Sequence, residues 1–256
     1  MAVLITVVAA VLLGAPALRL IWVALHTGRR PELWAGLFFV GAGVGVPLRV
    51  LGAARAAVDP ALAGPLNATG HVFFAVGAAS LIVFTRIVFR PGSAAAGWLC
   101  GAGVGLIAVS TLAVFATGST SAEQSGWMLF ANLSRVAALG WAFFESVRYY
   151  RMLRRRCGLG LEGTDPVVTD RFRLWALWTG ALAMAPLLAV VGRMLFLLFD
   201  LAEGGQELYY EVALAVIRFA MVCCAPIAVY GIWRSFFPSD HYLENVRTRP
   251  AVPAAV

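Results

Sequence analysis

The sequence predicts an all-α membrane protein, a seven-transmembrane-helix bundle whose N-terminus lies outside the cell. Composition is the first reason: 61% of the 256 residues are hydrophobic and 13% are charged, whereas a soluble domain carries about 25% charged residues. The mean hydropathy of +0.83 agrees with this class. The other two reasons are seven long apolar runs and the alternation of arginine between the segments that join them.

A membrane-crossing helix needs about 20 predominantly apolar residues. The runs that meet this requirement lie at 2–26, 33–54, 66–89, 95–117, 126–150, 173–199 and 209–234. The first run resembles a signal peptide at "GAPA", but it lacks a basic leading segment and its apolar pattern continues through "LRLIWVALH". We therefore predict one seven-helix domain over residues 1–238, followed by a short, flexible cytoplasmic tail over 239–256.

Arginine asymmetry sets the predicted orientation. Segments after the first, third, fifth and seventh runs are rich in arginine, and the opposite set is acidic on balance. The positive-inside rule then places the N-terminus outside and the C-terminus in the cytoplasm. The longest loop, 151–172, is cytoplasmic in this arrangement. Its arginines are explained by orientation, and they are also candidates to contact lipid headgroups or an acidic protein partner: Arg151, Arg154, Arg155 and Arg156.

All 20 basic residues are arginine, which is typical of a GC-rich bacterial genome and suggests a multi-pass protein of the cell (inner) membrane. The net charge of +7 follows from orientation and does not indicate nucleic-acid binding. Because the chain has no lysine, it cannot form a retinal Schiff base, and we expect no cofactor.

Two segments resemble each other within the chain. "ELWAGLFFVGAGVGVPLRVLG" and "RLWALWTGALAMAPLLAVVGR" share Leu-Trp-Ala, then proline, then arginine. This suggests a 3+1+3 repeat in which the fourth span connects two parallel units. Chance is the alternative, because membrane helices draw on few residue types.

Four arginines are predicted within the outer half of separate spans, where orientation does not explain them: Arg49, Arg135, Arg193 and Arg218. One interpretation is local pairing, of Arg193 with Asp200 and of Arg218 with Glu211. The other is a cavity that receives an anion, because charges inside a membrane usually face a bundle interior and arginine matches carboxylate and phosphate. The candidate ligand-binding residues are Arg49, His71, Asn132, Arg135, Arg193, Asp200, Tyr210, Glu211 and Arg218.

Other motifs do not indicate catalysis. "GAGVG" occurs at Gly41–Gly45 and Gly101–Gly105 outside any strand-to-helix turn, so we interpret it as close helix packing and not as nucleotide binding. The three histidines have no metal-ligand spacing. Ser80 and Ser110 have no base nearby in sequence. We expect no enzyme and no metal site, and we expect Glu145 to pair with Arg148.

Three stretches, "PLRVLGAA", "GRMLFLLFD" and "LYYEVALAVIRF…AVYGIWRSFFP", resemble the seven-helix tobamovirus multiplication protein family of plants. The resemblance implies a receptor-like bundle with an outside N-terminus, and implies neither a ligand nor a signalling partner. It covers Arg49, Arg193, Asp200, Tyr209, Tyr210 and Pro238.

The sequence therefore predicts a non-enzymatic membrane protein that binds a small anionic or amphiphilic ligand in an outward-facing cavity, as a sensor or a transporter. The alternative is a structural or scaffold subunit of a membrane complex that docks other proteins through its basic cytoplasmic loop. Lipid is the one partner common to both.

Overall fold

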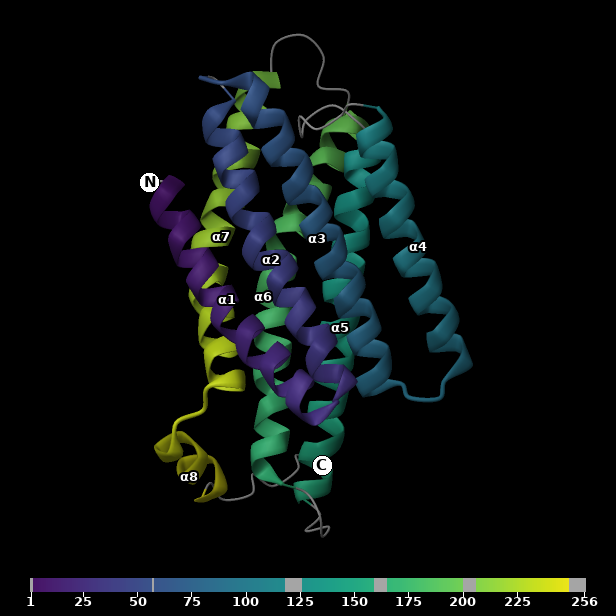
Figure 1. Ribbon diagram of the computed structural model, residues 1–256, viewed down its shortest axis with the longest axis vertical. Coiled ribbons are helices and arrows are strands. Elements are labelled where there is room, and N and C mark those ends of the chain that lie inside the picture. The colour runs from purple at the N-terminus through teal and green to yellow at the C-terminus, as the bar shows by residue number, and fades with distance from the viewer. Residues whose placement is uncertain (1, 57, 118–125, 159–164, 200–205, 249–256) are drawn as a thin grey trace. The chain divides into compact units, whose positions relative to one another are not determined.

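The computed structural model describes residues 2–56, 58–117, 126–158, 165–199 and 206–248, and all regular structure in these ranges is helical. Eight helices follow one another in this part of the chain (Figure 1): α1 (Ala2–Thr27), α2 (Arg30–Arg55), α3 (Pro60–Phe89), α4 (Ala94–Ala116), α5 (Gly126–Gly158), α6 (Pro166–Phe199), α7 (Gln206–Phe236) and α8 (Asp240–Thr248). The helices form two compact units, an N-terminal unit (Met1–Ala138) and a C-terminal unit (Leu139–Val256).

In the described ranges, six helices are long and apolar enough to cross a bilayer, namely α1 to α6. Their large apolar side chains are also widely exposed, as on α4, where Trp98 is 82% exposed. A surface of this kind suits lipid and not water. The chain is thus a multi-pass helical membrane protein. Helix α7 coincides with the predicted span 209–234, but several of its side chains lie outside the described residues, and the seventh crossing stays a prediction.

Helices α1 to α4 of the N-terminal unit pack in chain order, each against the next. The turns between them follow from local sequence. Gly28 and Gly92 adopt positive φ values of 66° and 79°, which glycine tolerates without steric cost. Asp59 caps α3 by accepting from the Leu62 amide at 3.2 Å, and Ser93 caps α4 by accepting from the amide of the third residue after it at 3.3 Å.

Helices α2 and α3 approach closely through small residues. A Cβ added to Gly41 would lie 2.5 Å from the Phe73 carbonyl oxygen and 2.6 Å from the Gly77 Cα. The packing interpretation of the first "GAGVG" is therefore confirmed. It is wrong at the outer positions of the second, because a Cβ on Gly101 or Gly105 would meet open space. These two glycines lie on the exposed face of α4, so the motif alone did not indicate whether a neighbouring helix packs against them.

In the C-terminal unit, α7 packs against α6 at Gly231, where an added Cβ would lie 3.0 Å from the Leu174 carbonyl oxygen. The end of α5 contacts α6 through Tyr149 and Phe172, whose ring centroids are 5.6 Å apart.

Helix α8 lies against α6 and was not predicted from the sequence. Its first turn is capped by Ser239, whose hydroxyl oxygen accepts from the Tyr242 amide at 3.3 Å. The N-terminal part of the predicted flexible tail is therefore helical, whereas residues 249–256 lie outside the described ranges.

Both predicted boundaries of the loop 151–172 are wrong, because the loop is shorter than predicted. Helix α5 continues to Gly158 and α6 begins at Pro166. Hydropathy ends the apolar run before "RMLRRRC", but arginine, leucine and methionine are good helix formers, so the helix continues past the apolar segment. The basic residues of this region consequently lie on a helix surface.

Candidate functional site

In the N-terminal unit, α2, α3 and the first part of α5 bring polar side chains to a similar level. Arg49 lies about 9 Å from the end of α2, His71 about 16 Å from the start of α3, and Arg135 about 13 Å from the start of α5, at 1.5 Å per residue. These three helix ends belong to the connections 55–60 and 117–126. All three residues were predicted from the sequence to lie in the outer half of their spans.

Arg135 contacts two of the other predicted residues. Its Nη1 donates to Asn132 Oδ1 at 3.1 Å, one helical turn earlier, and its Nη2 lies 2.9 Å from His71 Nδ1. A guanidinium only donates, so Nδ1 accepts and carries no proton. In this geometry the imidazole of His71 is neutral, with its proton on Nε2. Arg135 and His71 are deeply buried, 8% and 2% exposed.

A single aromatic ring joins both arginines. The guanidinium carbon of Arg49 lies 5.8 Å from the centroid of Phe74, and that of Arg135 lies 5.2 Å from it. A cation near an aromatic face is attracted to it by about 0.5–2 kcal/mol, more where water is excluded. Phe74 therefore attracts two like charges that repel each other.

Gly70 leaves room for the side chain of Arg49. A Cβ at Gly70 would lie 2.7 Å from Arg49 Cγ, so the absence of a side chain lets the arginine stem cross α3. Neither Gly70 nor Phe74 was predicted from the sequence. Phe74 follows His71 by three residues and so lies on the same helix face, which is the signal that identifies it once His71 is a candidate.

Carboxylates are the usual partners of buried arginine, and the described part of the N-terminal unit contains two acidic residues. Glu32 pairs with Arg29 at 3.7 Å, and Asp59 caps α3. Neither pairs with the site. Within the described ranges Arg49 makes no hydrogen bond or ion pair, and the hydrogen-bond partners of Arg135 are both uncharged.

Five further candidates lie outside what the structure describes. Arg193 is on α6, and Tyr210, Glu211 and Arg218 are on α7, but their side chains are not among the described ones, and neither is any part of Asp200. The ion pairs predicted for Arg193 and Arg218 stay predictions.

The basic segment at the end of α5 is exposed to solvent at its four predicted positions, Arg151, Arg154, Arg155 and Arg156. One turn earlier, the expected pair of Glu145 and Arg148 is confirmed, with 4.0 Å between Oε2 and Nη1.

The remaining polar candidates have structural roles. Ser80 and Ser110 donate to the carbonyls of Val76 and Ile107 in their own helices. No group of three or more His, Cys, Asp or Glu side chains in the described ranges is arranged to bind a metal.

A second cluster of arginines lies in the C-terminal unit, where α8 meets α6. The Asp170 carboxylate accepts from Arg173 Nη2 at 2.8 Å and from the Tyr242 hydroxyl. The guanidinium carbon of Arg234 lies 4.8 Å from the Tyr242 ring centroid, and its Nη1 donates to Ser239 Oγ at 3.3 Å. Each of these cations has a partner.

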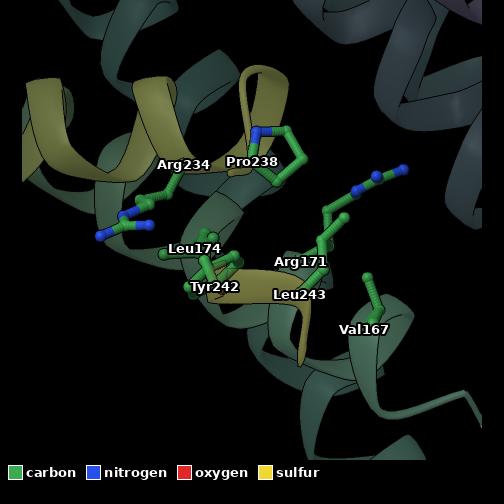
Figure 2. A pocket seen from close by; sticks show the side chains of 7 residues that line it. All are labelled: Val167, Arg171, Leu174, Arg234, Pro238, Tyr242 and Leu243. Carbon is green, nitrogen blue, oxygen red and sulfur yellow. The ribbon is translucent and has the colours of Figure 1, made fainter. Parts of the chain in front are cut away.

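The pocket beside this cluster is small. Its lining comes from α6, α7, α8 and the segment between α7 and α8, and it includes Arg171, Arg234 and Tyr242 (Figure 2). Its volume of about 10 Å³ is the room of a single water molecule. In Figure 2 the guanidiniums of Arg171 and Arg234 extend to opposite sides and do not converge.

The cluster of the N-terminal unit is therefore the candidate site: two guanidiniums from α2 and α5, with a neutral histidine and an amide, around one aromatic ring. Such a group donates hydrogen bonds and attracts negative charge. No family model, curated protein or solved structure matches the chain.

Proposed function

We propose that the chain is a seven-helix membrane protein that binds a small anionic or amphiphilic ligand at Arg49 and Arg135, as a sensor or a transporter of the cell membrane. His71 and Asn132 orient Arg135 within this site. The proposal includes α7 as the seventh span, an outside N-terminus and the 3+1+3 relation of the helices. The resemblance to receptor-like seven-helix proteins supports the same architecture.

The proposal rests mainly on one observation. Two guanidiniums of the N-terminal unit share the Phe74 ring, and both carboxylates in the described part of that unit are engaged elsewhere. A buried cation without a counter-charge is costly, and within a membrane ionisable residues usually mark a ligand or ion pathway. An anion that binds here supplies the counter-charge that the described residues of this unit do not.

The test uses the purified full-length protein in mild detergent. The apparent melting temperature is measured with added sulfate, phosphate, acetate or laurate at constant ionic strength. We expect at least one anion to raise it, and Arg49→Gln or Arg135→Gln to abolish that rise. Arg55→Gln is the matched control, because Arg55 is an exposed arginine on the same helix as Arg49. An anion effect that survives in both site variants contradicts the proposal.

A scaffold subunit is the second candidate function, and the exposed arginines at the end of α5 favour it. A partner protein with an acidic surface would bind there. Co-purification in stoichiometric amount, lost when Arg151, Arg154, Arg155 and Arg156 are changed to Gln, supports the scaffold. Purification without a partner, together with an anion-dependent melting temperature, supports the ligand-binding protein.

A further inference from the structure

The charges at the site indicate how many negative charges the proposed anion carries. Arg49 and Arg135 are both permanently charged, and the contact with Arg135 requires a neutral His71. With Glu32 and Asp59 engaged elsewhere, the described residues leave two positive charges around one ring. A ligand with two negative charges balances them, whereas a single carboxylate leaves one charge unanswered.

Geometry favours a tetrahedral group. The two guanidiniums come from different helices and approach the same ring. A carboxylate is planar, and its two oxygens match one guanidinium fork. A phosphate monoester presents three terminal oxygens in different directions, so two forks from separate helices can each bind part of it.

Hydrogen-bond polarity points to the same group. Asn132 Oδ1 and His71 Nδ1 both accept from Arg135. The polar atoms that these side chains still offer are donors: the remaining guanidinium N–H groups, the His71 Nε2–H and the Asn132 amide. The occupant must therefore accept hydrogen bonds and need not donate any. A fully ionised phosphate monoester meets this requirement.

We infer that the proposed anion site is a phosphomonoester site, in which Arg49 and Arg135 together bind the dianionic phosphate. This inference rests on the proposed function. Two sources share this chemistry. Arg49 lies about 9 Å from the end of its helix, and the interfacial layer of a bilayer is roughly 5–8 Å deep on each side, so both a lipid headgroup and a soluble phosphate ester can reach it.

The experiment compares ligands that differ in charge at one pH. Binding of glycerol 3-phosphate and of glycerophosphoglycerol, its diester analogue, is measured on the full-length protein in detergent. Binding of phosphatidate and of phosphatidylglycerol is measured in nanodiscs. We expect each monoester that binds to do so at least about tenfold more tightly than its diester, because the second charge meets a second guanidinium. A preference between the two glycerol compounds indicates a soluble phosphate ester as the ligand, and a preference between the two lipids indicates a lipid headgroup.

Variants test the charge count directly. Arg49→Gln leaves one guanidinium, so the preference for monoester is expected to fall to about twofold or less. Arg49→Lys keeps the charge and is expected to retain the preference, as is the Arg55→Gln control. The melting temperature without ligand, measured for every variant, establishes that each one is folded, and Arg135→Gln repeats the test on the other helix.

The outcomes separate the two proposals. Equal binding of monoester, diester and acetate, all weakened by Arg49→Gln, overturns the phosphomonoester inference and leaves the anion site in place. Binding that ignores both Arg49→Gln and Arg135→Gln, or no binding by any anion, overturns both.

Discussion

The two units of the chain surround arginine in different ways. In the C-terminal unit Arg173 binds the Asp170 carboxylate at 2.8 Å, and Arg234 donates to a serine hydroxyl and lies on the Tyr242 ring. Among the described residues of the N-terminal unit, Arg135 has neutral hydrogen-bond partners and Arg49 has the Phe74 ring. Burial is therefore not enough to assign a structural role to an arginine, because the charge of its partners differs between the two units.

The same contrast appears in solvent access. The Arg173 side chain is 36% exposed and can turn to water if it loses its carboxylate, whereas Arg135 is 8% exposed as a residue. An arginine that has both a partner and water contributes to the stability of the fold. One that has neither water nor a counter-charge among the described residues is what the proposed binding site requires. Substitutions distinguish the two cases.

The largest effect is expected from separating the helices that carry the N-terminal cluster. Gly41→Val places methyl groups where the backbone of Phe73 and Gly77 already lies, and we expect a loss of about 3 kcal/mol in unfolding free energy because backbone does not yield. The proposed anion binding at Arg49 should be lost with it. Thermal unfolding in detergent measures the first effect. Gly101→Val, at an open position, is the control, and equal losses in the two variants would contradict the packing described.

The next effect concerns the C-terminal cluster. Asp170→Ala removes the acceptor of Arg173 and of the Tyr242 hydroxyl, and we expect a loss of about 2 kcal/mol, typical for hydrogen bonds to a charged group. Helix α8 should undock from α6, so trypsin should cleave faster after Arg247. Glu244→Gln neutralises an exposed acid on α8 and should change neither readout. Unchanged cleavage in Asp170→Ala would show that the carboxylate does not retain α8.

A matched pair of substitutions tests whether removing an arginine changes stability in opposite directions in the two units. Arg173→Met should lower stability by about 1 kcal/mol, because it removes the cation that the Asp170 carboxylate binds. Arg49→Met, in buffer free of multivalent anions, should leave stability unchanged or raise it by up to about 1 kcal/mol, because it removes a half-buried charge that has no counter-charge among the described residues. Melting temperatures in one detergent give both values. A similar loss in the two variants would remove the distinction between the units.

The smallest effect is expected at Arg148. Its side chain is 62% exposed and 4.0 Å from the Glu145 carboxylate, and exposed pairs of this kind contribute about 0.5 kcal/mol or less. Arg148→Ala should therefore hardly change the melting temperature. A loss above about 1 kcal/mol would show that even an exposed pair in this unit is structural.

Most of the fold was predictable because apolar runs longer than about 20 residues are rare outside membrane spans. The positions of Arg49, His71 and Arg135 along their helices were predictable too, since helix rise is constant. The angular position of each residue and the helix that it faces depend on tertiary packing. For that reason Phe74, Gly70 and the contact between Arg135 and His71 were not found. Helix α8 was missed because its nine residues, most of them polar, are too few to give a transmembrane signal.

The shared ring of Phe74 has an experimental consequence. Because one aromatic ring lies near both guanidiniums, its electron density acts on both of them. Fluorine atoms added stepwise to this phenylalanine withdraw that density while leaving the net charge unaltered and the size of the side chain nearly so. The cluster thus offers a graded chemical control in which the ring competes with the proposed anion for the same two cations.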